Sequence, residues 1–508
     1  MKLLQNKLAL LATFIFILMS RLAIGAADRP SDDTINYWIK EALREDQRVN
    51  VADITVKTND GIVTLSGFTR NLAGKNYADL EAKKIQGVRG VIDELVVRPA
   101  YRFDADIAQD IRQRWVYNAF IKSHGLWVTV FDGKAILNGK VNSWAERREA
   151  ELLATEVRGV KAVDNKLEVE YQTKRPDEQI KSDVISAIHR DVYLAALPIQ
   201  VLVYNGVVTL TGEVGNAYQK ERAADRSLGI NNVKSVDNKI VVTWWRERGV
   251  RERMALLSDD QLNQTVRDAL YQDMRVEPFD IAVDASYGHV TLRGTIPSYH
   301  QKQLAEQDAR EVVGVAWVSN LLSVRTEPRS DDAILQDIRS AIDSDYLLNG
   351  QDVKVRVQDG KVTLTGNVNE YYEKSDATTV ASKVLGVWDV VNNISVNWFF
   401  KFTDAALEQR IKDRLLSHDA TRWVADQIKV NVKDGKATLT GQTYDWSERY
   451  EVGRIALSTD GIKSVENDLT VIDVNYPWDK WNSPWFYGVG PNSLSFCDRR
   501  NRIFRPTG

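Results

Sequence analysis

The sequence predicts an α+β protein, a tandem array of six small two-layer αββαβ sandwich domains. Two observations predict this class. An octapeptide similar to "DGKVTLTG" occurs six times, and a second pattern similar to "GVKAVDNKL" begins twenty residues after the last glycine of every copy. Successive copies lie 72, 73, 82, 72 and 75 residues apart. This length fits small autonomous domains better than the shorter repeats of solenoids.

Each octapeptide predicts a β-hairpin with a two-residue turn. An Asp-Gly or Asn-Gly pair favours a type I′ turn, because glycine adopts positive φ without steric cost. In the fifth copy this turn would place Val357 opposite Val362 and Val355 opposite Leu364, all on one face. The second glycine should end or bend the returning strand close to other backbone. The structural hairpin glycines are Gly61, Gly67, Gly133, Gly139, Gly206, Gly212, Gly288, Gly294, Gly360, Gly366, Gly435 and Gly441.

The rest of each copy predicts two helices and a third strand. Eleven and eighteen positions after the second glycine stand mostly apolar residues, such as Ala377 and Val384, and these offsets fit one stripe of a helix. The later Gly-Val pair would end that helix, with the glycine at C′. Before the hairpin another amphipathic helix is expected, with a capping box at residues 258–261 in the fourth copy. Each domain should therefore hold a three-stranded sheet with two helices on one face.

The element order, the (D/N)G-x-V-T-L-x-G hairpin and the later G-V-x-x-V-x-N-x-L pattern resemble the BON domain of bacterial osmotic-stress and nodulation proteins. Asn232 replaces the late glycine in the third copy and Tyr287 replaces the turn Asp or Asn in the fourth, which leaves the turn geometry of these two copies open. The six BON-like domains are expected at residues 30–99, 103–171, 175–243, 258–326, 330–398 and 402–472.

The resemblance also implies a location and a role. Proteins of this family are typically exported to the bacterial periplasm and associated with osmotic or envelope stress. They are proposed to bind phospholipid or to attach to membranes. The resemblance therefore implies a periplasmic protein, peripheral on a membrane, whose partners are phospholipid or other envelope components.

Residues 1–26 have the layout of a secretory signal peptide, which agrees with this location. Lys2 and Lys7 precede an apolar run over residues 8–19, and small residues near position 25 suit cleavage. An uncleaved anchor is the alternative, and Arg21 disfavours it because it ends the run short of a spanning length. The single cysteine, Cys497, cannot form an internal disulfide, so the domains must be stabilised by packing; whether it pairs with another chain stays open.

The sequence contains no arrangement typical of a catalytic or metal site. The five histidines, His124, His189, His289, His300 and His418, occupy different positions in the copies, at no catalytic or metal-ligand spacing. The turn acids have a structural explanation, because Asn205 replaces the acid in one copy. The net charge of −3 disfavours nucleic acid as the main partner. We therefore expect no enzyme, no cofactor and no catalytic or metal-binding residues.

Two segments lie outside the repeated pattern. The charged stretch at residues 244–257 predicts a linker that divides the domains into three and three, and residues 473–508 form an aromatic and basic tail. Aromatic rings beside cations suit a bilayer interface, so the tail is a candidate membrane contact. Alternatively, the tail folds back over the sixth domain. The aromatic clusters at 244–246 and 398–401 are expected to wedge between domains. The tail residues concerned are Trp478, Trp481, Trp485, Phe486, Tyr487, Arg499 and Arg500.

Two functional hypotheses follow. The first is a non-catalytic periplasmic protein that associates with phospholipid membranes or the cell envelope, where several tethered weak contacts add up. The second is a periplasmic protein-binding scaffold or chaperone-like protein that uses exposed sheet faces or edges. For the fifth domain the strand alternation predicts a polar free face, with Lys354, Arg356, Thr363 and Thr365. Neither hypothesis defines the oligomeric state.

Overall fold

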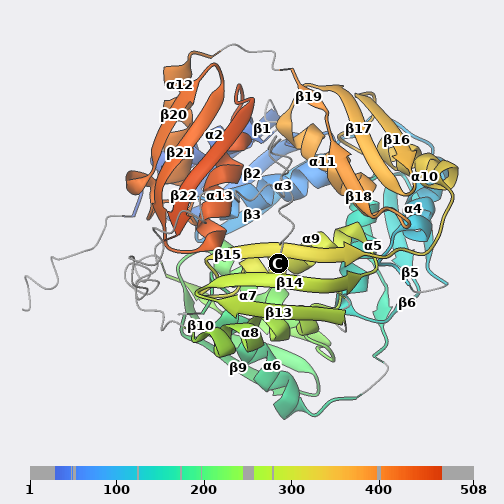
Figure 1. The fold of residues 1–508 in the computed structure, drawn as a ribbon, viewed down its shortest axis with the longest axis horizontal. Helices are drawn as coiled ribbons and strands as arrows, with labels where there is room; N and C mark the ends of the chain where they lie inside the picture. The colour runs from blue at the N-terminus through green and yellow to red at the C-terminus, as the bar shows by residue number, and fades with distance from the viewer. Residues whose placement is uncertain are drawn as a thin grey trace, which may run out of the picture.

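The protein is described here from a computed structural model that covers residues 29–46, 48–49, 53–122, 125–171, 174–195, 197–243, 257–276, 280–397 and 402–471. Along the chain these residues form six units with the order helix, strand, strand, helix, strand (Figure 1). The expected signal peptide, residues 244–256 of the expected linker, residues 398–401 and the tail at 473–508 lie outside the described residues.

The first three units have the following elements. Unit 1 contains α2 (Asp32–Glu45), β1 (Ile54–Asn59), β2 (Ile62–Thr69), α3 (Leu72–Lys83) and β3 (Gly90–Val97). Unit 2 contains α4 (Asp104–Tyr117), β4 (Trp127–Phe131), β5 (Lys134–Asn138), β6 (Lys140–Val141), α5 (Trp144–Thr155), β7 (Ala162–Asn165) and β8 (Glu168–Val169). Unit 3 contains α6 (Asp177–Arg190), β9 (Ile199–Tyr204), β10 (Val207–Val214), α7 (Ala217–Leu228), β11 (Ser235–Asn238) and β12 (Val241–Val242).

The last three units repeat the same order. Unit 4 contains α8 (Asp259–Gln272), β13 (Ile281–Ser286), β14 (His289–Ile296), α9 (Tyr299–Arg310) and β15 (Trp317–Val324). Unit 5 contains α10 (Asp331–Ser344), β16 (Asp352–Gln358), β17 (Lys361–Val368), α11 (Tyr371–Ser382), β18 (Asp389–Asn392) and β19 (Ser395–Val396). Unit 6 contains α12 (Asp404–Ser417), the short 3₁₀ helix η4 (Ala425–Gln427), β20 (Lys429–Lys433), β21 (Lys436–Thr443), α13 (Trp446–Leu457) and β22 (Ser464–Val471).

Each unit is the predicted two-layer α+β sandwich. In unit 5, β16 pairs antiparallel with β17, and β18 and β19 pair parallel with β17, so the second hairpin strand is central. The predicted register is confirmed, because Val357 pairs with Val362 and Val355 with Leu364. These strands and both helices enclose one apolar core, which includes Ile338.

A side chain from the first helix holds the hairpin turn. Asp359 and Gly360 have φ angles of 50° and 74°, as a type I′ turn requires. The Asp331 carboxylate, in the first turn of α10, accepts hydrogen bonds from both turn N–H groups at 2.8 Å. Every unit has an equivalent aspartate: Asp32, Asp104, Asp177, Asp259, Asp331 and Asp404. Tyr287 keeps the same conformation with a φ of 51°, so the turn survives its replacement of the usual Asp or Asn.

The second glycine of each hairpin lies against the backbone of the first strand. Gly366 has a φ of 120°, and a Cβ atom there would stand 1.8 Å from the carbonyl oxygen of Asp352. The corresponding distance is 1.9 Å for Gly67, to the Asp53 oxygen, and 2.9 Å for Gly139, to the Gly125 oxygen. Only glycine fits where two strands approach this closely.

The prediction for the late glycine was wrong in one respect. Helix α11 ends at Ser382 with Lys383 as its C-cap, so Gly386 lies three residues beyond the C-cap and not at C′. Val384, which was expected on the helix stripe, also lies outside the helix, where it forms an isolated antiparallel bridge with Asn118 of unit 2. The segment between helix and glycine is a short turn, and in unit 5 this turn carries the bridge to another unit.

These bridges pair the six units from the ends of the chain inward. Ile85 of unit 1 pairs with His418 of unit 6, and Asp191 of unit 3 pairs with Val312 of unit 4. Units 2 and 5 share two reciprocal bridges, Asn118 with Val384 and Val157 with Asp345. Since equivalent residues of the two units exchange roles there, this pair has a local pseudo-twofold axis.

Contacts at the starts of the second helices join the units into rings. Leu72 packs against the core of unit 2, and Ala217 of unit 3 lies in the core of unit 1. Tyr171 of unit 2 donates a 2.8 Å hydrogen bond to the Val233 oxygen of unit 3. Units 1, 2 and 3 therefore all touch one another, which closes a first ring.

Units 4, 5 and 6 close a second ring in the same way. Tyr299 of unit 4 packs against the core of unit 5, and Trp446 of unit 6 lies in the core of unit 4. Arg454 of unit 6 donates to the Tyr372 hydroxyl of unit 5 at 3.5 Å. Figure 1 shows the sheets of these three units arranged around a common centre. The three inter-ring pairs then join the two rings into a closed assembly of six units in one chain.

We predict that Gly366→Ala destabilises unit 5. The backbone conformation alone should lower the free energy of unfolding by about 1–3 kcal/mol, and the overlap with the Asp352 oxygen should add to this. Urea unfolding followed by tryptophan fluorescence measures the change. Gly229→Ala is the matched control, because Gly229 has a φ of −66° and its nearest neighbour would lie 3.5 Å from the new Cβ. Equal stability of both variants would contradict the close-approach argument.

We also predict that Ile85→Cys and His418→Cys form a disulfide in a Cys497→Ser background. Two backbone hydrogen bonds flank these residues, from Gln86 N–H to the Ser417 oxygen and from Asp419 N–H to the Lys84 oxygen. Ile85 and His418 therefore form a non-hydrogen-bonded antiparallel pair. The Cα atoms of such a pair lie about 4.5 Å apart, which suits a disulfide. Oxidation and peptide mapping should recover the 85–418 crosslink. The control variant combines Ile85→Cys with Val312→Cys. Val312 is the residue of unit 4 equivalent to Ile85, and this pair of cysteines should stay reduced. Crosslinking of the control pair alone would refute the pairing.

Candidate functional site

The predicted site residues fall into two groups. The hairpin glycines lie in the turns and at the close strand approaches, where they are part of the backbone scaffold. The tail residues proposed as a membrane contact lie outside the described residues. The side chains that the structure brings together are instead charged groups at the three inter-ring pairs, and no sequence motif pointed to them.

The interface of units 2 and 5 contains buried ion pairs. Arg114 in α4 is 2% exposed and donates to the Asp345 carboxylate at 3.0 Å and to the Ala341 oxygen at 2.9 Å. Lys383 lies 3.3 Å from Glu156. Burial would lower the pKa of Lys383, but the carboxylates of Glu149 and Glu156 outweigh it and raise the pKa above its usual range. Both cations therefore stay charged in the interior.

The interface of units 3 and 4 has the same character with different residues. The Asp191 carboxylate accepts from Arg222 Nε at 2.8 Å and from Arg226 Nε at 2.7 Å. Both guanidinium groups also contact Glu311 of unit 4. Burial acts to raise the pKa of Glu311, yet Arg222 and Arg226 lower it well below its usual range. The cluster therefore contains two cations and two anions.

The interface of units 1 and 6, together with Glu370 of unit 5, contains acids whose pKa values are raised. Arg410 of unit 6 forms an ion pair with Glu45 of unit 1, which is 2% exposed. Burial and the Glu45 carboxylate raise the pKa of Asp460 to about 6, and burial together with Asp460 raises the pKa of Glu370 to about 9. Burial lowers the pKa of His418 to about 4, so this imidazole is neutral at pH 7.

These clusters can select which units pair. A buried ion pair adds little net stability, because desolvation offsets the attraction between the charges. Losing one partner is costly, however, since it leaves an uncompensated buried charge. Each interface combines different residues across the two units, such as Arg114 with Asp345 in one and Arg222 with Glu311 in another. We conclude that exchange of partners between units would leave charges unmatched.

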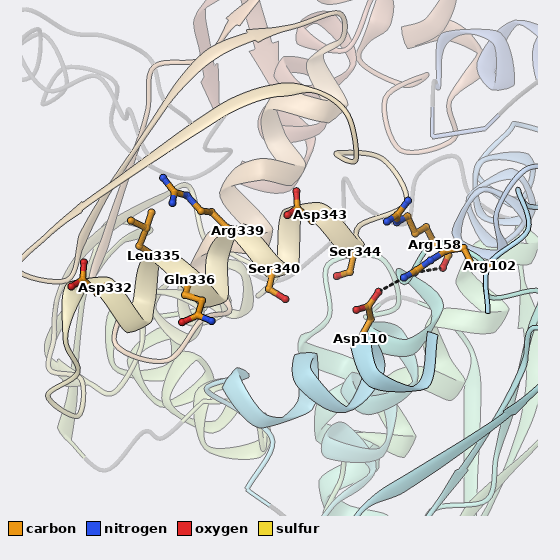
Figure 2. Close-up of a pocket in the computed structure, with 10 residues that line it drawn as sticks. All are labelled: Arg102, Asp110, Arg158, Asp332, Leu335, Gln336, Arg339, Ser340, Asp343 and Ser344. Carbon is orange, nitrogen blue, oxygen red and sulfur yellow. Dashed lines mark hydrogen bonds and ion pairs between the residues drawn. The ribbon is translucent and has the colours of Figure 1, made fainter. Parts of the chain in front are cut away.

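An open groove lies between α4 and α10 at the mouth of the interface between units 2 and 5. It has a volume of about 510 Å³, and Figure 2 shows Arg102 between Asp110 and Arg158 on one wall. Arg102 binds the Asp110 carboxylate at 2.8 Å and the Arg158 oxygen at 3.0 Å. Three arginines and three aspartates line the groove, so its charge is balanced. The lining residues are Arg102, Asp110, Arg158, Asp332, Leu335, Gln336, Arg339, Ser340, Asp343 and Ser344.

The described histidines lie apart from one another. His189 lies in the last turn of α6, and His289 Nε2 lies 2.8 Å from Ser319 Oγ. His300 in α9 is half-buried, and desolvation lowers its pKa to about 4. Within the described residues, no group of three or more His, Cys, Asp or Glu side chains could hold a metal ion. His124 and Cys497 lie outside those residues.

None of the helices in the described ranges combines the length and the apolar character that crossing a bilayer requires.

Comparison with known proteins identifies similar domains and relatives. The BON domain model matches residues 31–99, 103–171, 176–243, 258–326, 330–397 and 403–473. The chain is 35% identical over 143 residues to the Osmotically-inducible protein Y of Escherichia coli (strain K12), which covers 27% of this chain and 71% of that protein. It is 29% identical over 148 residues to the Outer membrane lipoprotein DolP of Haemophilus influenzae, which covers 29% of this chain and 73% of that protein.

Two solved structures also match. Both are of CdsD, a structural protein of the type III secretion system of Chlamydia trachomatis, at 17% and 18% identity. They cover 44% and 46% of this chain and 99% and 98% of their own chains, with TM-scores of 0.12 and 0.13. Scores this low support no structural argument. The six domain matches, by contrast, cover most of the sequence and coincide with the six structural units, and the chain therefore belongs to the BON domain family.

Proposed function

We propose that this protein is a non-catalytic component of the bacterial periplasm that associates with phospholipid membranes or the cell envelope during osmotic or envelope stress. The observation that carries the proposal is the presence of six BON domains over most of the chain. The names of two relatives, an osmotically-inducible protein and an outer membrane lipoprotein, support the stress and envelope parts of the proposal.

The charged side chains of the described units fit a structural role better than a catalytic one. Arg114, Asp345 and Lys383 are at most 5% exposed. Arg114 binds Asp345 and the Ala341 oxygen, and Lys383 binds Glu156. In the groove between α4 and α10, Arg102 is held by Asp110, and Ser340 donates to Gln113 at 3.0 Å. A nucleophile needs an adjacent base and an orienting third group, and these contacts provide neither.

The tail supplies the membrane contact in this proposal. It follows β22, whose last residue, Val471, packs against the core of unit 4. Trp481, Trp485 and Phe486 are the proposed anchors, because aromatic rings partition to headgroup depth. Arg499 and Arg500 would add attraction to anionic lipid, about 1 kcal/mol for each cation near the surface.

We predict that the purified protein floats with anionic liposomes at low salt, and that replacement of Trp481, Trp485 and Phe486 by alanine lowers the bound fraction. High salt should also weaken binding, because screening shortens the reach of the arginine charges. The measurement is the protein fraction recovered with vesicles after density-gradient centrifugation.

The matched control removes three exposed aromatic rings elsewhere: Tyr37→Ala, Tyr101→Ala and Phe103→Ala. This variant should float like the unchanged protein. If the full chain fails to float at low salt, the lipid proposal is wrong. If both triple variants lose binding equally, the contact is not specific to the tail.

A further inference from the structure

The first hairpin strand of every unit is an edge strand. In the described residues β1, β4, β9, β13, β16 and β20 each pair only with the second strand of their own hairpin. An edge carries unpaired N–H and C=O groups that can bind another chain, and proteins usually protect such edges with charged side chains. Six copies of one hairpin in the same chain allow the protection of the edges to be compared position by position.

Four of the six edges carry a charge on the side chains that point away from the core, and two do not. The two without charge are β4 and β9. On β9, Leu202 is 63% and Tyr204 77% exposed, and on β4, Trp127 is 54% and Phe131 78% exposed. The outward residues, in chain order, are Thr55, Lys57 and Asn59; Trp127, Thr129 and Phe131; Gln200, Leu202 and Tyr204; Ala282, Asp284 and Ser286; Lys354, Arg356 and Gln358; and Lys429, Asn431 and Lys433.

A second protection seen in unit 6 is also missing from these two edges. There, Glu408 of α12 accepts a 2.9 Å hydrogen bond from the N–H of Val432 on the edge strand. The equivalent helix positions, four residues after the turn-binding aspartate, hold Ala108 in unit 2 and Lys181 in unit 3. Neither side chain can accept a hydrogen bond. No helix side chain at this position can therefore satisfy the edge N–H of β4 or β9.

The strand register shows which backbone groups face outward. Tyr204 pairs with Val207 across the two-residue turn, and Leu202 pairs with Thr209. Because hydrogen-bonded and non-hydrogen-bonded pairs alternate in an antiparallel ladder, the N–H and C=O groups of Val201 and Val203 point away from β10. The same alternation on β4 directs those of Val128 and Val130 away from β5.

We propose that β4 and β9 each bind an extended, uncharged polypeptide segment with alternate apolar side chains, which adds a strand to the sheet. Only an extended backbone offers donors and acceptors at the spacing of these open groups. The segment's alternate side chains would lie beside Leu202 and Tyr204, and residues 198–212 contain no charge that would need an opposite charge on the partner. This inference does not depend on lipid binding.

A second copy of the chain is a less suitable occupant than a different polypeptide. Each copy has two unprotected first-strand edges, β4 and β9, so self-pairing through both would link copies without closure into a growing filament. A different polypeptide bound to either edge would satisfy its open backbone groups, and no further copy of the chain would then add at that edge. The two edges belong to units 2 and 3 of the same ring, so one molecule would offer two strand-binding sites.

Fluorescence anisotropy tests the proposal with the full chain and a labelled, end-blocked eight-residue peptide of alternating threonine and valine. We expect saturable binding that Thr129→Arg with Leu202→Arg weakens about tenfold, because each arginine would place a charge beside the apolar side chains of the added strand. Leu202→Arg copies the natural Arg356 of β16, so the hairpin tolerates it. N-methylation of two adjacent central amides of the peptide removes one hydrogen-bond donor from each of its two edges. This change should weaken binding to the unchanged protein by about the same factor as the two arginine substitutions.

The reciprocal variant, Lys354→Thr with Arg356→Leu, removes the protection of β16 and should add a binding site. This variant keeps the proposal testable even if the arginine substitutions disturb folding. Absence of peptide binding, or equal binding of the N-methylated peptide, would overturn strand addition. Self-association that Leu202→Arg abolishes, without peptide binding, would assign the edge to a second copy instead.

Discussion

The arrangement of the six units depends on one short antiparallel bridge, repeated at each inter-ring pair. The residues just after the second helix, such as Val384, pair with the residue that ends the first helix of another unit, such as Asn118. Two backbone hydrogen bonds flank each bridge, for example Leu385 N–H to Tyr117 oxygen at 2.8 Å. Each bridge brings the end of a first helix beside the end of a second helix from another unit, and charged side chains near these ends are buried there.

Burial of these charges explains why the pairing is specific. The bridges are backbone contacts that any two units could form, and so they do not discriminate among partners. The ion pairs can do so, since Arg114 meets a carboxylate only where Asp345 faces it. Specificity of this kind is a role of buried polar groups in some proteins, although their contribution to stability is small. In this chain, such specificity agrees with the observed pairing, in which unit 1 pairs with unit 6 and unit 3 with unit 4.

The sequence predicted the features that arise from local chemistry. The turn at Asp359 and Gly360 and the register of its strands follow from neighbouring residues, and both are confirmed. The sequence shows an aspartate at the start of every first helix, which was a visible signal for the turn contact. However, Asp331 and the turn residue that it binds are 28 residues apart, and no spacing rule connects them. The role of Gly386 was mistaken because a short turn separates the helix from this position, and in every unit the C-cap lies three residues earlier.

The charged clusters could not be predicted, because they join distant parts of the chain. Arg114 and Asp345 are separated by 231 residues. The position of Asp345 holds aspartate in units 1, 3 and 4 as well, but the arginine that binds it there comes from the same unit, two residues later in units 1 and 4 and from the second helix in unit 3. The repeat pattern therefore shows the shared acid, whereas its partner differs among the copies. The same reasoning makes the edge strands informative: Leu202 and Arg356 occupy the same position, so their difference cannot result from the demands of the hairpin.

The closed arrangement changes how several weak contacts could act together. Flexibly tethered domains gain from a raised effective concentration, whereas units fixed in two rings can bind one surface together only if their sites face the same way. The edges β4 and β9 both belong to the first ring, and the tail follows β22 of the second ring. Strand addition would therefore occur on the first ring, whereas the tail is attached to the second ring.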